Sequence, residues 1–202
     1  AHIALPLGIS FFTFQTMSYT IDVYRGDVKA SRSYLDFLTF VTLFHQLVAG
    51  PIVRFRDLSD RIRERTVESN EFLDGVHRFC VGLAKKVVFA NTAGALVESV
   101  MGGQFTEVSF GTAWLVAVLY GFQIYFDFSG YSDMAIGLGK MAGFRYLENF
   151  RHPFMASSVR EFWRRWHISL MTFFRDYLYI PLGGNRHHWL RNIFIVLIKN
   201  FY

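Results

Sequence analysis

Long apolar segments alternate with short basic stretches along the chain. Three of them, at residues 5–24, 81–101 and 110–128, carry few charges and approach the ~20 residues that a helix needs to cross a bilayer. Lysine and arginine gather outside them, as at 25–32 and 151–165, and such residues concentrate in the cytoplasmic loops of membrane proteins. The pattern predicts an all-α, multi-pass membrane protein whose clearest span is 110–128 and whose basic stretches face the cytoplasm.

A further apolar segment, at residues 35–53, differs from these three spans. Basic residues lie on both of its flanks, so a plain span would place one basic flank outside the cell. Gly50-Pro51 also interrupts any helix there. Because broken backbone at membrane depth needs surrounding protein or water, we expect a re-entrant or interfacial element that lines a central cavity. A short amphipathic surface helix is expected at 70–78, separate from the span that begins at Val81.

Composition supports the membrane assignment. Hydrophobic residues make up 52% of the chain and charged residues 18%, whereas a soluble domain carries about 25% charged residues. The net charge of +5 lies in clusters between the apolar segments, which is not the pattern of a nucleic-acid-binding face. One cysteine excludes an intramolecular disulfide, and no Cys/His spacing suits a metal. We therefore expect no metal, no bound cofactor and no nucleic acid.

The densest group of ionisable and aromatic residues runs from Glu161 to Arg186. Ionisable groups close to hydrocarbon are costly and usually mark a function. Ser158 and Glu161 match a capping box, which predicts a helix that begins at Ser158. Helical spacing would place His167 on one face of that helix with four apolar residues, Trp163, Leu170, Met171 and Phe174.

Each polar residue of this group has two interpretations. His167 is either a hydrogen-bonded histidine packed among aromatic rings or a neutral imidazole that accepts a proton from a hydroxyl. The arginines are either membrane anchors on the cytoplasmic side or ligands for the phosphate of an acyl donor, because guanidinium groups bind phosphate bidentately. The arginines concerned are Arg164, Arg165 and Arg175.

A second polar group lies in the apolar segment around residues 123–133. Helical rotation places Gln123, Asp127 and Tyr131 on one face and Asp133 elsewhere. These residues either form a buried network that holds helices together or line a cavity and orient His167. Small residues follow at Gly137, Gly139 and Gly143, at spacings that let helices approach closely in a membrane.

Several of these stretches resemble the membrane-bound O-acyltransferase family. The resemblance rests on Trp166-His167, on the Pro-Leu-Gly-Gly run at 181–184, on the Tyr-Phe-Asp-Phe-Ser-Gly-Tyr-Ser-Asp run at 125–133, and on residues 44–54. It implies that His167 occupies the first of two active-site positions, and it assigns no role to the 125–133 run. We separately expect Trp163 and Trp166 to line the cavity with Gln123 and Asp127. The second position, a histidine in a later apolar segment, would lie beyond Tyr202. We therefore expect residues 1–202 to be one membrane domain that is incomplete at both ends.

The resemblance also implies an activity, with alternatives. It is strongest to the branch that acetylates an alginate-like exopolysaccharide. Such a protein would lie in the bacterial inner membrane and pass acetyl groups from a cytoplasmic thioester, acetyl-CoA or another, toward the polymer through a periplasmic acetyltransferase partner. The alternatives are O-acyl or D-alanyl transfer to another envelope polymer, a transporter of acyl groups or lipids that catalyses nothing, and a structural subunit that recruits a soluble enzyme.

Overall fold

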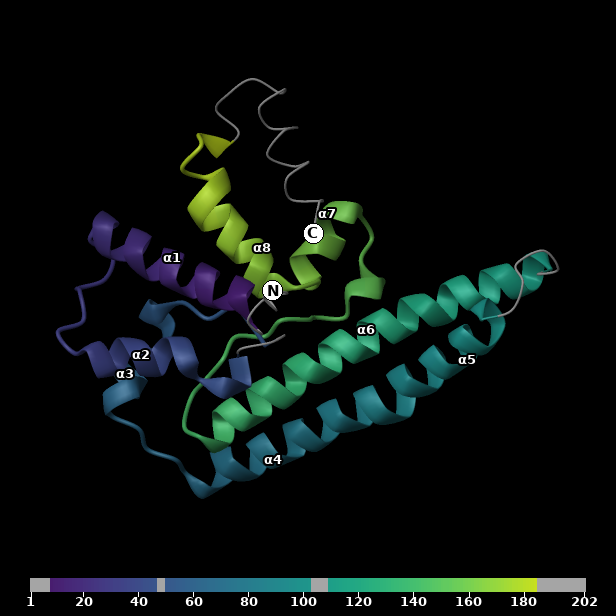
Figure 1. The fold of residues 1–202 in the computed structure, drawn as a ribbon, viewed down its shortest axis with the longest axis horizontal. Coiled ribbons are helices and arrows are strands. Elements are labelled where there is room, and N and C mark those ends of the chain that lie inside the picture. Colours follow the sequence, from purple (N-terminus) through teal and green to yellow (C-terminus); the bar gives the residue numbers. More distant parts are fainter. Residues whose placement is uncertain (1–7, 47–49, 103–108, 185–202) are drawn as a thin grey trace, which may run out of the picture. The chain divides into compact units, whose positions relative to one another are not determined.

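The computed structural model describes residues 8–46, 50–102 and 109–184, and every regular element among them is helical (Figure 1). The all-α prediction is thus confirmed for the described part. The α-helices are α1 (Ile9–Arg25), α2 (Tyr34–Thr42), α3 (Phe55–Arg63), α4 (Ser69–Ala84), α5 (Asn91–Met101), α6 (Phe110–Met141), α7 (Val159–Arg165) and α8 (Ile168–Phe174). Short 3-10 or π segments are η1 (Phe44–Gln46), η2 (Lys85–Ala90), η4 (Pro153–Met155) and η5 (Arg175–Tyr179).

The chain divides into two compact units. The first comprises residues 1–43, 51–63 and 147–202, and the second comprises 44–50 and 64–146. The first unit thus contains α1, α2, α3, α7 and α8, and the second contains α4, α5 and α6. Both units draw on separated stretches of sequence, and a single membrane domain over 1–202 stays a prediction.

In the second unit, α4, η2 and α5 form one continuous helical run that lies beside α6 (Figure 1). Two pairs of glycines bring α4 and α6 together. A Cβ atom built on Gly137 would lie 2.6 Å from the carbonyl oxygen of Gly75, and one built on Gly130 would lie 2.7 Å from that of Gly82. The expected close approach of helices at small residues is therefore confirmed at Gly137.

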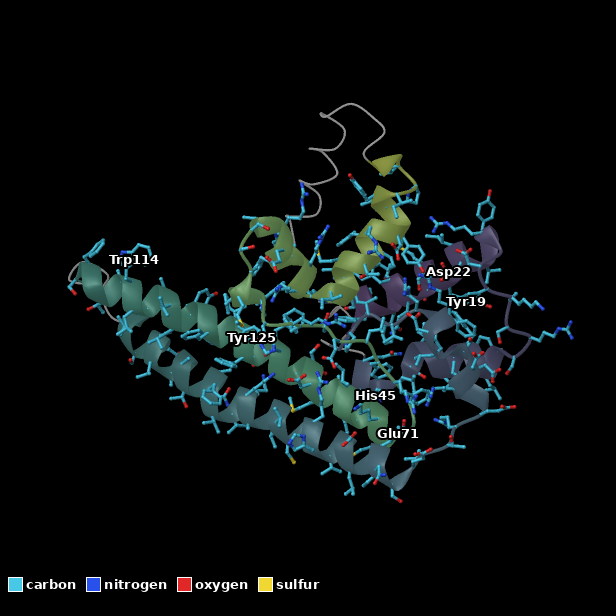
Figure 2. The ribbon with its side chains drawn as sticks, turned by 180° about the vertical axis from the view of Figure 1, so that it is seen from behind. Tyr19, Asp22, His45, Glu71, Trp114 and Tyr125 are labelled. Carbon is cyan, nitrogen blue, oxygen red and sulfur yellow. The ribbon has the colours of Figure 1, made fainter. Side chains whose placement is uncertain are left out.

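One described helix, Ser69–Met101, is long and apolar enough to cross a membrane. Only 22% of its most apolar window is buried, and Val88 and Phe89 are more than half exposed. Trp114 of α6 is likewise 62% exposed (Figure 2). Apolar side chains that a structure leaves uncovered in this way suit contact with lipid or with further helices.

Two details of the predicted spans were wrong or unsupported. The surface helix expected at 70–78 is not separate from the next segment, because the backbone continues through Lys85 and Lys86 as a π-helical stretch. Lysine is a good helix former, and the ammonium groups of Lys85 and Lys86 pair with Asp133 and Asp127 of α6. Among the described helices, α6 falls short of the apolarity that Ser69–Met101 reaches, because glycine, tyrosine, glutamine and aspartate dilute its apolar residues.

In the first unit, α1 packs against α2 and α3, and its aromatic side chains meet the core around Phe173. One face of α1 is buried yet polar, with Gln15, Ser18 and Asp22 all fully buried. The Tyr177 hydroxyl donates to the Asp22 carboxylate at 2.8 Å. The interruption predicted in 35–53 is confirmed, since α2 ends at Thr42 and residues 50–54 are not helical.

Candidate active site

The helix that carries the sequence motif begins where expected. The Ser158 hydroxyl accepts a hydrogen bond from the Glu161 N–H at 3.2 Å and caps α7. The Glu161 carboxylate turns back and accepts from the N–H and hydroxyl of Ser157 at 2.9 and 2.8 Å. These bonds, with the Arg165 side chain, lower the pKa of Glu161 to about 2. The predicted cap at Ser158 is confirmed, but the reciprocal bond of the capping box is replaced, because Glu161 accepts from Ser157 rather than from the N–H of Ser158.

The helix does not continue through His167, so the predicted face shared with Trp163 is wrong. α7 ends at Arg165, Trp166 is extended, and His167 adopts the left-handed conformation with φ 45° and ψ 54°. α8 begins at the next residue. The interruption occurs because the N–H of Ile168 bonds to the Asn149 carbonyl at 2.9 Å instead of continuing the ladder of α7.

Asn149 lies at the centre of the contacts around this break. It is fully buried, and its Oδ1 atom lies 3.0 Å from Nδ1 of His167. The same oxygen accepts from the N–H of Ser169 at 3.2 Å and from its hydroxyl at 2.9 Å. The Ser169 hydroxyl accepts in turn from the Ile52 N–H at 3.0 Å. Sequence reasoning missed both residues: Asn149 lies 18 residues before His167, and Ser169, although it follows His167 by two residues within the same stretch, is assigned no role there.

Burial controls the charge of the imidazole. His167 is largely shielded from water, and this burial lowers its pKa to about 4. The ring is therefore neutral near pH 7 and holds a lone pair that can accept a proton. The interpretation of His167 as a base is compatible with this environment, and so is a packed histidine.

The two tryptophans lie in an aromatic cluster of the first unit. Trp166 stacks on Phe162 with ring centroids 5.6 Å apart and meets Phe150 edge-on at 5.1 Å. Trp163 contacts Phe162 at 5.5 Å. Both tryptophans are partly buried. These rings give the His167 segment an apolar surrounding, and a role in lining a cavity stays a prediction for Trp163 and Trp166.

The three arginines predicted to hold the donor are not gathered around one another. Arg165 pairs with Glu161, four residues earlier on α7, and Arg164 is exposed. Arg175 contacts the Asp176 carboxylate at 2.7 Å.

Asp176 brings three further arginines to that position. Arg54 lies 3.0 Å and Arg56 lies 3.7 Å from its carboxylate, and Arg25 donates to its backbone carbonyl at 3.3 Å. Sequence reasoning missed that Arg25, Arg54 and Arg56 contact Asp176 together with Arg175, because they lie more than a hundred residues away from it.

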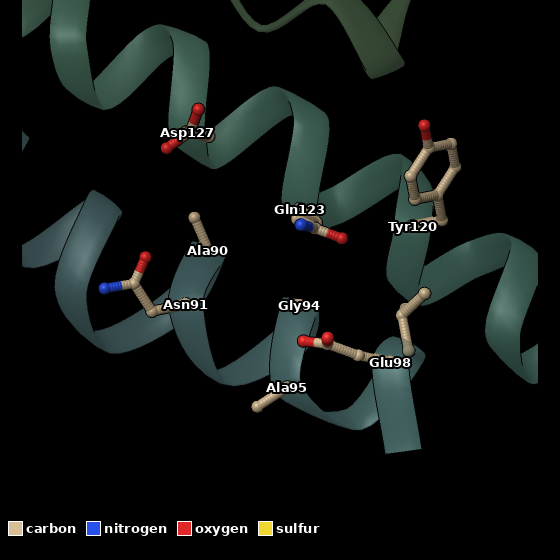
Figure 3. Close-up of a pocket in the computed structure, with 9 residues that line it drawn as sticks. Ala90, Asn91, Gly94, Ala95, Glu98, Tyr120, Gln123 and Asp127 are labelled. Atoms are coloured by element: carbon tan, nitrogen blue, oxygen red, sulfur yellow. The ribbon is translucent and has the colours of Figure 1, made fainter. Parts of the chain in front are cut away.

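Gln123 and Asp127 belong to the second unit, where they line a pocket of about 570 Å³ between α5 and α6 (Figure 3). Its other polar lining comes from Asn91, Glu98 and Tyr120. Asp127 also pairs with Lys86, whereas Asp133 pairs with Arg78 and Lys85. The predicted separation of Asp127 from Asp133 is confirmed. Trp163 and Trp166 are not part of this pocket's lining.

Within the described residues, no group of three or more His, Cys, Asp or Glu side chains could hold a metal ion. His187, His188 and Arg186 lie outside the described residues, as does the apolar run that begins at Trp189.

A described part that is all-α, with an apolar, largely uncovered helix and a neutral histidine after a tryptophan, suits a membrane-embedded transferase. The model of the membrane-bound O-acyltransferase family matches residues 9–201, and the chain belongs to that family.

Three relatives indicate the range of activities in the family. The chain is 52% identical over 200 residues to a probable alginate O-acetylase of Pseudomonas fluorescens, covering 98% of this chain and 40% of the relative. It is 37% identical to a peptidoglycan O-acetyltransferase of Helicobacter pylori, covering 98% and 43%. It is 31% identical to a teichoic acid D-alanyltransferase of Streptococcus thermophilus, covering 87% and 44%. The chain thus spans less than half the length of these relatives.

Proposed function

We propose that this chain is part of a membrane O-acetyltransferase that passes acetyl groups from a thioester toward an alginate-like exopolysaccharide. The 52% identity to an alginate O-acetylase, against 37% and 31% for the peptidoglycan and teichoic acid enzymes, favours this acceptor. Transfer of an acyl or D-alanyl group to another envelope polymer is the second candidate, because those two relatives carry such activities in their names.

The observation that carries the proposal is the neutral, positioned imidazole of His167. In the proposed step it takes the proton of the attacking hydroxyl as the oxygen bonds to the thioester carbonyl carbon. The carbon–sulfur bond then breaks, and the imidazolium returns the proton to the departing thiolate. The net change is one ester formed and one thiol released. The family's second histidine, expected beyond Tyr202, would share this work.

The arginines around Asp176 suit the donor end of the reaction. Arg25, Arg54, Arg56 and Arg175 all contact Asp176, and Arg54 also pairs with Asp57 at 2.9 Å, so four arginines meet two carboxylates and positive charge remains in excess. Guanidinium groups bind phosphate well, and acetyl-CoA and phosphopantetheine carriers both present phosphate. We therefore propose that Arg25, Arg54 and Arg56 hold the donor with Arg175, while a donor role for Arg164 and Arg165 stays a prediction.

We further propose a multi-pass protein of the bacterial inner membrane, with a periplasmic acetyltransferase that completes the transfer. The basic stretches at 25–32, 54–65 and 151–165 would then face the cytoplasm. Cysteines introduced at Ser59 and Ser157, in a Cys80→Ser background, should resist an impermeant thiol reagent in intact cells. Labelling at Ser59 alone would show that residues 35–53 span the membrane.

The decisive test removes the imidazole in the full-length protein. His167→Ala should lower polymer acetylation by ~10²–10⁴-fold, the usual contribution of a general acid–base group. Acetyl content of secreted polymer, normalised to membrane-extracted protein, is the readout. His77→Ala is the matched control, because His77 is exposed on α4. His167→Asn should keep more activity than His167→Ala, since the amide can still hydrogen-bond and asparagine occupies this position in some family members.

The same assay separates the rival functions. Wild-type acetylation in His167→Ala, at equal protein level, would leave His167 as a packing residue and favour a transporter or a structural subunit. Acetylated peptidoglycan or D-alanylated polymer, with unmodified exopolysaccharide, would favour the second candidate. Loss of exopolysaccharide acetylation in His167→Ala but not in His77→Ala supports the acetyltransferase.

A further inference from the structure

The backbone at His167 needs a partner that the local sequence does not provide. A non-glycine residue with positive φ is uncommon, although histidine tolerates the left-handed region better than most. The first N–H groups of α8 also lack partners within the helix. The buried Asn149 provides acceptors for the first two of these N–H groups: its backbone carbonyl accepts from Ile168, and its side-chain oxygen accepts from Ser169. A second backbone hydrogen bond, from the Arg151 N–H to the Arg165 carbonyl at 2.9 Å, also joins the segment around Asn149 to the end of α7.

The Ser169 N–H also decides which way the Asn149 amide faces. A backbone N–H can only donate, so the amide atom 3.2 Å from it must be the oxygen rather than the NH2 group. Nδ1 of His167 lies 3.0 Å from that same oxygen. An amide oxygen only accepts, so Nδ1 must carry the hydrogen. In a neutral imidazole, the lone pair is then on Nε2.

We propose that Asn149 is a positioning residue that fixes the Nδ1–H tautomer of His167 and so presents Nε2 as the atom that takes the acceptor proton. The proposal rests on the proposed acetyl transfer and adds the atom and the residue that selects it. The Ser169 hydroxyl supports the arrangement, because it donates to the Asn149 oxygen while accepting from Ile52.

Two substitutions in the full-length protein separate this role from a structural one. Asn149→Ala removes the acceptor, and the rate of acetyl transfer should fall by ~10–100-fold. This is the loss typical when the hydrogen-bonding partner that orients a metal-ligating histidine is removed. Asn149→Asp keeps an acceptor at Nδ1 but adds a negative charge, which raises the pKa of His167. The activity of Asn149→Asp should approach that of the wild type at alkaline pH and fall as pH decreases. The acidic limb of its pH–rate profile should therefore lie at higher pH than that of the wild type. Asn70→Ala and Asn70→Asp, at an exposed asparagine of α4, are the matched controls.

A second readout does not depend on activity. Exchange of the imidazole C2 hydrogen for deuterium, followed by mass spectrometry as a function of pH, reports the protonation of each histidine. The His167 midpoint should rise in Asn149→Asp and stay unchanged in Asn70→Asp.

The outcomes separate the two proposals. Equal loss of rate in Asn149→Ala and Asn149→Asp at every pH, with no movement of the His167 midpoint, would overturn the positioning role and leave the acetyltransferase intact. Full activity in Asn149→Ala would do the same. A moved midpoint in a protein whose wild type transfers no acetyl group would uphold the contact between Asn149 and His167 while the proposed function failed.

Discussion

The contact between α4 and α6 allows a stability prediction in which helix propensity cancels. Gly130→Ala and Gly137→Ala would each place a Cβ atom 2.6–2.7 Å from a backbone carbonyl oxygen of α4, which cannot move aside as a flexible side chain can. Forcing extra volume into a packed contact costs typically ~1–3 kcal/mol. Replacing glycine by alanine within a helix gains up to ~1 kcal/mol.

Gly121→Ala is the matched control, because it lies in the same helix and a Cβ atom there meets nothing within 4 Å. The propensity gain is common to all three variants, so Gly130→Ala and Gly137→Ala should be less stable than Gly121→Ala by ~1–3 kcal/mol. Thermal unfolding of the full-length protein in one detergent, followed by tryptophan fluorescence, measures the difference. Equal midpoints for the three variants would refute the close approach of α4 and α6.

Two further predictions concern ionised groups. Asp133→Asn would leave Arg78 and Lys85 without the carboxylate that they contact at 2.6 and 2.5 Å. It should lower stability by ~1–3 kcal/mol, which is less than the cost of breaking a fully buried pair because the cations are partly exposed. The same thermal assay measures this loss, and an unchanged midpoint would contradict it. The pKa of Glu161 falls from 4.5 in the unfolded chain to about 2 in the folded one. Its contribution to stability is therefore fully present above pH 4.5 and is lost as pH falls toward 2. The stability of Glu161→Gln should accordingly depend less on pH in that window than the stability of the wild type, and parallel curves for the two proteins would disprove the capping role.

The features that the sequence predicted correctly are local ones. The cap at Ser158 depends on residues three positions apart, and the interruption at Gly50-Pro51 depends on two adjacent residues, a glycine with a permissive backbone and a proline with no N–H to donate. Gly137 could be expected at a helix contact because small residues recur around it. In the first two cases the physical cause and its consequence lie within one or two turns of chain, whereas the partner of Gly137, Gly75, lies on another helix and is not indicated by the local pattern.

The features that the sequence did not predict depend on distant partners. Helical periodicity cannot show that the chain breaks after Trp166, because the break is stabilised by Asn149, which lies 18 residues before His167. The arginine cluster has the same origin, since Arg54 and Asp176 are 122 residues apart. Only the folded backbone brings such groups together, and the sequence contains no periodic signal for them.

The left-handed backbone at His167 means that His167→Ala changes two things at once. Alanine removes the imidazole, and it also pays ~1–2 kcal/mol for a conformation that L-residues other than asparagine, aspartate and histidine rarely adopt. His167→Gly removes the imidazole but adopts φ 45° without steric cost. If the imidazole performs the chemistry, both variants should be equally inactive, while His167→Gly unfolds at a higher temperature than His167→Ala. If instead activity returns in His167→Gly, the defect of His167→Ala arises from the backbone at the start of α8, and the proton transfer must be assigned to another group.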